Sequence, residues 1–157
     1  MDRPRALARD VDRAIAQLDE VLAACPPPTA GLRCGRDSRT VSAVANHVAD
    51  WLQVLAESVP IQIGAEMSQF HGEVADELDA ALAKSAANRS LEEARLSLRR
   101  SRERLDVVLG ALQEGDIEAT VQSGDRAVDV GTFIRRWGCD HVVEHAAAIR
   151  AALLARR

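Results

Sequence analysis

Three of the four histidines in the chain have a spacing that suits metal binding. His141 and His145 are four residues apart in the segment CDHVVEHAAAIR, so on a helix their side chains differ by about 40° in direction and about 6 Å in height. His47 lies between Val44 and Trp51 at helical spacing, at the edge of an apolar stripe. A buried imidazole without hydrogen-bond partners costs roughly 1–3 kcal/mol. A divalent cation that binds one nitrogen of each ring removes this cost.

The same residues have a second interpretation. His141 and His145 could be half-exposed helix residues that are hydrogen-bonded to their neighbours, with His47 unrelated to them. If the metal is present, three protein ligands leave a tetrahedral ion with one open position, as in catalytic sites. Because imidazoles must be neutral to bind a metal, we expect metal release as the pH falls below about 6.5.

Five further residues are candidates for the surroundings of this site. Asp50 and Glu144 could accept hydrogen bonds from the ligands, with a general-base role also open to Glu144; as an exposed helix residue, Glu144 would have neither role. His71 could approach as an extra ligand or base, or lie on the surface. Trp51 and Trp137 could wall one pocket if their helices are antiparallel, or simply pack in the core.

Helical periodicity of apolar residues recurs four times along the chain. The pattern predicts four long helices, over about 4–24, from an N-cap at Thr40 to Pro60, from a capping box at Ser90 to about 112, and from an N-cap at Asp129 to the last residues. Four amphipathic helices predict an all-α four-helix bundle, with residues 1–157 as a single domain.

The connection between the second and third long helices is unusually long. It begins with the segment SVPIQIGAEMSQF and continues into an extra helix predicted over about 71–86. Such a connection can cross over the bundle, so the third helix need not run antiparallel to the second. Residues 115–129 contain turn residues at Ser123–Asp125 between short alternating runs, which indicates a small hairpin.

Composition limits the possible functions. Hydrophobic residues make up 47% of the 157 residues and charged residues 28%, as in an ordinary globular protein. The net charge of −4 argues against a nucleic-acid partner, which requires a concentrated basic surface. No stretch reaches the roughly 18 apolar residues of a membrane span, and the charged N-terminus cannot serve as a secretory signal. We therefore expect a cytoplasmic protein without a membrane partner.

The three cysteines lack metal-site spacing. In a reducing cytoplasm we expect Cys25, Cys34 and Cys139 to be free thiols, with a Cys25–Cys34 bridge as the alternative.

Two segments resemble a known family. TVSAVANHVADWLQVL and VGTFIRRWGCDHVVEHAAAIR are similar to the second and last bundle helices of the DinB-like metalloprotein superfamily, which includes the mycothiol-dependent maleylpyruvate isomerases. The resemblance extends from about Leu7 to Leu154. It implies an up-down-down-up topology and zinc or nickel held by one histidine of the second helix and two ligands of the last. In this chain those positions are His47, His141 and His145.

The resemblance also implies a function. Many members use a low-molecular-weight thiol, such as mycothiol or bacillithiol, for S-transfer to an electrophile or for isomerisation, and a homodimer is common. Isomerase members carry an additional C-terminal domain, which is not expected after Arg157, and use a carboxylate where this chain has His141. An S-transferase is therefore favoured over an isomerase. The alternatives are a non-enzymatic metal- or ligand-binding protein of a stress response and an interaction protein without metal.

Overall fold

The structure, a computed structural model, describes residues 2–36, 38–64, 72–123 and 126–156. Four long helices and the crossover helix account for most of it: α1 (Arg3–Ala23), α2 (Val41–Gly64), α3 (Gly72–Ala86), α4 (Leu91–Gly110) and α7 (His141–Ala155). The shorter elements are a 3₁₀ turn (Pro27–Thr29), α5 (Glu114–Glu118), α6 (Val130–Ile134) and strands β1 (Arg33–Cys34), β2 (Arg39–Thr40), β3 (Thr120–Ser123) and β4 (Arg126–Asp129).

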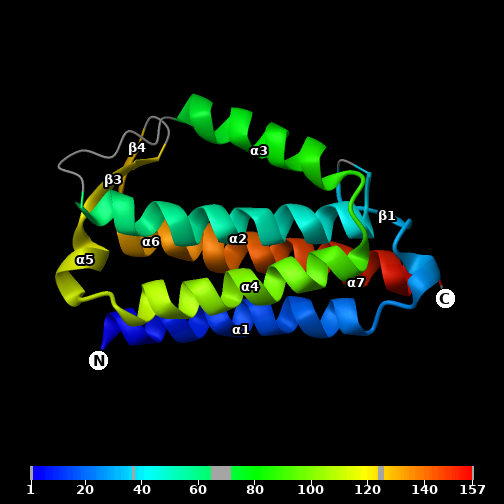
Figure 1. Cartoon of the computed structure of the whole chain (residues 1–157), viewed down its shortest axis with the longest axis horizontal. Coiled ribbons are helices and arrows are strands. Elements are labelled where there is room, and N and C mark those ends of the chain that lie inside the picture. The colour runs from blue at the N-terminus through cyan, green and yellow to red at the C-terminus, as the bar shows by residue number, and fades with distance from the viewer. Residues whose placement is uncertain (1, 37, 65–71, 124–125, 157) are drawn as a thin grey trace.

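The bundle has the topology that the resemblance implied. In Figure 1, α1 and the last helix run from left to right, whereas α2 and α4 both run from right to left. The helix α3 returns above α2, and this crossover lets α4 start at the same end of the bundle as α2. The prediction of an up-down-down-up four-helix bundle with an extra crossover helix is therefore confirmed.

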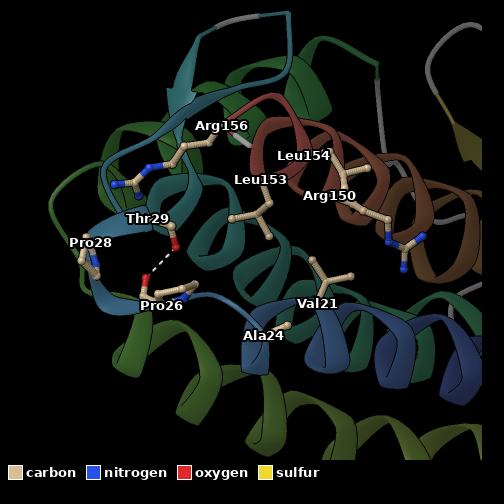
Figure 2. Close-up of a pocket in the computed structure, with 9 residues that line it drawn as sticks. All are labelled: Val21, Ala24, Pro26, Pro28, Thr29, Arg150, Leu153, Leu154 and Arg156. Carbon is tan, nitrogen blue, oxygen red and sulfur yellow. Dashed lines mark hydrogen bonds between the residues drawn. The ribbon is translucent and has the colours of Figure 1, made fainter.

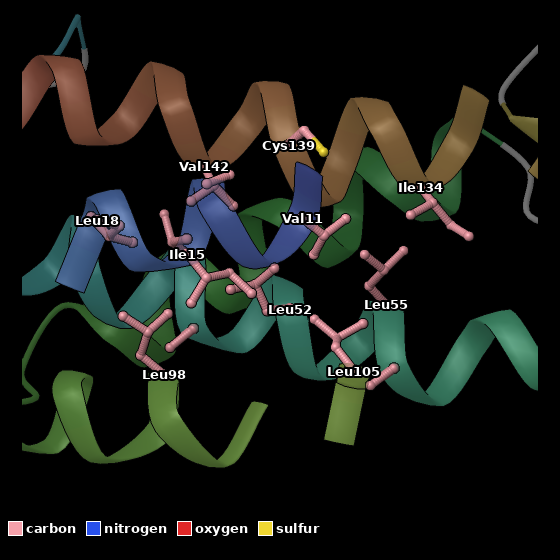
Figure 3. Close-up of a cluster of buried hydrophobic side chains, with 14 of the residues drawn as sticks. Val11, Ile15, Leu18, Leu52, Leu55, Leu98, Leu105, Ile134, Cys139 and Val142 are labelled. Atoms are coloured by element: carbon pink, nitrogen blue, oxygen red, sulfur yellow. The ribbon is translucent and has the colours of Figure 1, made fainter. Parts of the chain in front are cut away.

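Apolar stripes from all four bundle helices meet in one core. Figure 3 shows aliphatic side chains of α1, α2, α4 and the last helix directed into the space between them. The largest fully buried aliphatic residues include Ile15, Leu18, Leu52, Leu55, Leu98, Leu105, Ile134 and Ile149. Burial of each such side chain stabilises the fold by about 1.5–3 kcal/mol before conformational entropy is considered. This core fixes the relative positions of α2 and α7, which carry the three histidines.

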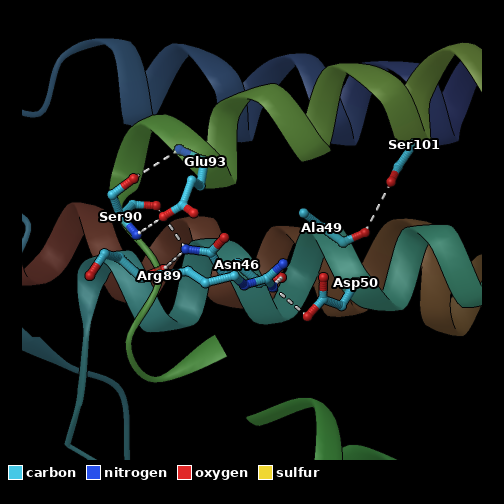
Figure 4. A network of polar contacts seen from close by, with 8 residues as sticks. Asn46, Ala49, Asp50, Arg89, Ser90, Glu93 and Ser101 are labelled. Atoms are coloured by element: carbon cyan, nitrogen blue, oxygen red, sulfur yellow. Dashed lines mark hydrogen bonds and ion pairs between the residues drawn. The ribbon is translucent and has the colours of Figure 1, made fainter. Parts of the chain in front are cut away.

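Polar contacts fix the start of α4 against α2 (Figure 4). Ser90 and Glu93 form the predicted capping box, because each side chain accepts a hydrogen bond from the other's backbone N–H. The Asn46 side chain donates to the Ser90 carbonyl oxygen at 2.9 Å, and Arg89 donates to the Asp50 carboxylate. These bonds set the register of α4 on the part of α2 that carries His47.

The second bundle helix is longer than predicted. Its N-cap is confirmed, since Thr40 Oγ1 accepts from the backbone N–H of Ala43 at 3.2 Å. The predicted end at Pro60 is wrong, because α2 continues to Gly64 with the proline inside it. Proline lacks the N–H that would bond to the Ala56 carbonyl, but a helix can tolerate the loss of this bond within its last turns.

The hairpin prediction is confirmed in its second half. Strands β3 and β4 pair in antiparallel fashion with Thr120 opposite Asp129, whereas residues 114–118 form the short helix α5. The two-residue strands β1 and β2 were not predicted, since such short pairs leave no periodicity in a sequence.

All three cysteines are free, as expected.

The last bundle helix is interrupted just before the first of its two histidines. Asp129 caps α6 as predicted, by accepting from the Thr132 backbone N–H, but residues Arg135–Asp140 form a π-helical segment. A Cβ atom on Gly138 would lie 3.1 Å from side-chain carbons of both Leu55 and Val11. The missing side chain thus permits the close approach of this segment to α1 and α2.

Among the described residues, no helix combines the length and the apolar character that crossing a bilayer requires.

Candidate metal centre

The fold brings the three histidines together. His47 comes from α2, and His141 and His145 lie one turn apart on α7. The ring centroid of His47 is 5.5 Å from that of His141 and 5.5 Å from that of His145, and the latter two are 4.5 Å apart. Each ring offers one nitrogen to a group of atoms that all lie within 4.8 Å of one another.

Two of the three imidazole rings are buried, and a buried ring nitrogen needs a hydrogen-bond partner or a metal ion. His47 is 1% exposed and His141 is 7% exposed, and His145 is half-buried. Within the described residues, Nε2 of His141 is buried and has no hydrogen-bond partner. Nitrogens bound to one tetrahedral cation through bonds of about 2.1 Å lie roughly 3.4 Å apart. The three ligand nitrogens would therefore have to move only slightly closer together to bind one ion. The three imidazoles therefore fit a divalent metal ion.

The environment keeps His141 in the form that can bind a metal. Burial, with smaller contributions from the neighbouring rings of His145 and His47, lowers the pKa of His141 from 6.5 to about 3. A neutral imidazole retains the lone pair that coordinates a cation. The ring is thus ready to ligate without first losing a proton to solvent.

We expect the metal-free protein to lose stability as the pH falls below about 6.5, the pKa of an unfolded histidine. Between that value and the folded-state pKa of about 3, the unfolded chain binds a proton at His141 that the folded chain excludes. The free energy of unfolding therefore falls by up to about 1.4 kcal/mol per pH unit. Denaturant unfolding at several pH values should show a weaker dependence for His141→Gln, and an unchanged dependence would contradict this assignment.

The two tryptophans stack on one side of the histidines. Their ring centroids are 4.5 Å apart with an angle of 8° between the planes, as expected for antiparallel helices. The Trp137 ring centroid lies 5.4 Å and the Trp51 ring centroid 6.1 Å from that of His141. Trp51 is buried and Trp137 is half-buried, so the first belongs to the core and the second borders the site.

One carboxylate at the site was not predicted from the sequence. Asp79, on the crossover helix α3, places Oδ1 at 3.2 Å from His47 Nε2 and accepts a hydrogen bond from Trp51 Nε1 at 2.8 Å. The sequence predicts that α3 exists, but it does not define how this helix is rotated against the bundle. The sequence contains a single indication, which is an acidic residue on the helix that forms the crossover.

The other polar candidates have different surroundings. Asp50 is engaged by the Arg89 guanidinium, and Glu144 is exposed and paired with Arg136 at 3.0 Å. The hydrogen bonds from the metal ligands to these two carboxylates stay predictions. His71 lies outside the described residues.

An apolar pocket of about 530 Å³ lies elsewhere, where the ends of α1 and α7 meet the 3₁₀ turn (Figure 2). It is lined by Val21, Leu153 and Leu154, among others, and by no histidine. The guanidinium groups of Arg150 and Arg156 point to opposite sides in Figure 2, so they do not converge on one point. We assign no role to this pocket in the chemistry of the histidines.

Fold and site together define a four-helix bundle with a three-histidine cluster between its second and last helices. The chain belongs to the DinB superfamily, whose family model matches residues 10–149. No curated protein sequence matches the chain.

Solved structures share the fold at low sequence identity. A mycothiol-dependent maleylpyruvate isomerase is 16% identical with a TM-score of 0.78, and the match covers 93% of this chain but only 60% of the isomerase. YfiT from Bacillus subtilis, a probable metal-dependent hydrolase with an unusual four-helix bundle topology, is 13% identical with a TM-score of 0.75, covering 98% of this chain and 87% of YfiT. An uncharacterised protein from Clostridium difficile 630 is 15% identical with a TM-score of 0.71, and 94% of each chain is covered.

Proposed function

We propose that this chain binds one divalent metal ion, zinc or nickel, through His47, His141 and His145, and that it transfers a small thiol of the mycothiol type to an electrophile. The observation that carries the proposal is the convergence of three imidazoles from two helices within 4.8 Å. The same fold occurs in a mycothiol-dependent isomerase and in a probable metal-dependent hydrolase.

His47, His141 and His145 would hold the ion, which would lower the pKa of a thiol or water that binds to it. Burial keeps the His141 imidazole neutral, and the two helices hold the three rings in place. The stacked indoles of Trp51 and Trp137 give the cluster an apolar surface on one side. Asp79 brings a negative charge to its edge.

S-transfer is favoured over isomerisation. The chain spans 60% of the isomerase's length. According to the family resemblance, isomerase members also bind their metal with a carboxylate at the position of His141. His141, as a third neutral ligand, would leave a metal ion with more positive charge than a carboxylate would, and this charge would favour the deprotonation of a thiol.

Turnover of mycothiol with a chlorinated aromatic electrophile tests the proposal. In the expected reaction a carbon–sulfur bond forms, the carbon–chlorine bond breaks, chloride leaves and the thiol proton passes to solvent. We expect metal-loaded wild type to catalyse this reaction and His145→Ala to lose at least about 100-fold in kcat/KM. The matched control is Val143→Ala, an exposed change on the same helix, which should retain activity.

The second candidate is a metal- or ligand-binding protein without catalytic activity. Metal uptake combined with no turnover over a broad panel of thiols and electrophiles would favour it over the transferase. We further propose a cytoplasmic homodimer, in line with the family resemblance. Sedimentation of the purified protein and cell fractionation test these two points.

A further inference from the structure

We propose that Asp79 is a positioning residue of the metal centre and that it fixes the His47 ring so that Nδ1 faces the metal. The inference rests on the proposed function, because it requires that His47 is a ligand. It assigns a role to the crossover helix α3, which contributes none of the three histidines.

The close contact between Asp79 and His47 determines the tautomer, because a nitrogen lone pair and an oxygen lone pair would repel each other at this distance. Asp79 Oδ1 lies 3.2 Å from Nε2 of His47. An ionised carboxylate only accepts hydrogen bonds, so Nε2 must carry the proton. A neutral imidazole has a single N–H, and its lone pair is then on Nδ1. The contact with Asp79 therefore presents Nδ1, and not Nε2, as the nitrogen of His47 that binds a cation.

The carboxylate itself is held in place. The same oxygen, Oδ1, accepts from the Trp51 indole N–H at 2.8 Å, and an indole N–H can only donate. His47 and Trp51 are one turn apart on α2, so one oxygen bridges two successive turns of that helix. This bridge fixes the rotation of the His47 ring and attaches α3 to the wall of the site.

Asp79 acts on the metal through His47. The carboxylate is outside the group of ligand atoms that lie within 4.8 Å of one another, which contains the three histidines alone among the described residues. A carboxylate that accepts from the far N–H of a ligating histidine orients the ring and raises its basicity, and its loss costs about 10- to 100-fold in metal affinity. We expect a loss of this size when Asp79 is removed.

The first experiment compares metal affinity in Asp79→Ala, Asp79→Asn and the control Glu77→Gln, which removes an exposed carboxylate from the same helix. Zinc is titrated in competition with a chromogenic chelator. We expect Asp79→Ala to weaken binding by about 10- to 100-fold. Asp79→Asn, whose side-chain oxygen still accepts but carries no charge, should lose less, and Glu77→Gln should match wild type.

The second experiment measures the tautomer directly and needs no metal. Two-bond proton–nitrogen spectra of nitrogen-labelled, metal-free protein at about pH 8 distinguish Nδ1–H from Nε2–H imidazoles, and His47→Gln assigns the signal of His47. We expect the Nε2–H form in wild type and Asp79→Asn, and a mixture in Asp79→Ala. Coupling to isotope-labelled cadmium should then appear at Nδ1 of His47.

The outcomes separate the two proposals. If wild type binds no metal but its His47 is the Nε2–H tautomer, the proposed function fails and the orientation by Asp79 stands. If wild type binds metal and Asp79→Ala matches it in affinity and tautomer, the inference about Asp79 is wrong and the metal site remains. Cadmium coupling at Nε2 of His47 would likewise overturn the inference. If Asp79→Ala does not fold, the His47 tautomer in wild type and the metal affinity of Asp79→Asn still test the inference.

Discussion

Replacing His141 by alanine is expected to weaken metal binding by at least about 100-fold, because two imidazoles remain of a three-imidazole ligand set. The same change should leave the metal-free protein at least as stable as wild type. His141 is 7% exposed and its Nε2 has no hydrogen-bond partner among the described residues. Removing such a group relieves a desolvation cost of about 1–3 kcal/mol, which offsets the lost packing.

Equilibrium dialysis against zinc or nickel measures the first effect, and denaturant unfolding in the presence of a chelator measures the second. Val143→Ala, two residues away on the same helix and exposed, controls for a general effect of substitution in α7. Wild-type affinity in His141→Ala would mean that this ring does not bind the metal. A large decrease in the free energy of unfolding of the metal-free variant would show instead that His141 stabilises the core by packing.

The second large effect is expected from Leu52→Ala in the middle of the bundle. Leu52 is 0% exposed and lies among the aliphatic side chains of Figure 3. Truncating a buried leucine removes its transfer free energy and leaves a cavity, which together cost about 2–5 kcal/mol. Because small domains are stable by only about 5–15 kcal/mol, we expect a large shift of the denaturant midpoint with an unchanged slope.

Leu154→Ala is the matched control, since this leucine on α7 is 57% exposed. It should change the free energy of unfolding by less than about 0.5 kcal/mol. Equal effects of the two substitutions would show that the packing between α2 and its neighbours is not as described.

The sequence predicts the long helices well because each has its own local signals. The capping box at Ser90, the caps at Thr40 and Asp129 and the apolar periodicity of each segment act within a few residues. The convergence of His47 with His141 and His145 also follows from periodicity once the helices face a common core. The four-helix bundle and the grouping of the histidines were therefore accessible without coordinates.

Other features depend on contacts between distant segments. The π-helical segment before His141 accommodates Gly138 against Leu55 and Val11, and apolar periodicity does not distinguish it from an ordinary helical turn. Asp79 reaches His47 only because α3 is rotated in one particular way. A sequence that specifies helices through local patterns does not specify such rotations, so a residue on a crossover helix is recognised as part of a site only in three dimensions.

The metal content of the purified chain tests the central claim most directly. After equilibration with zinc or nickel and removal of unbound ions, mass spectrometry of the metal should find about one ion per chain, and none in the triple variant of His47, His141 and His145. A wild-type chain without bound metal under these conditions, or a triple variant that binds as much as wild type, would contradict the assignment of these three histidines as a metal centre.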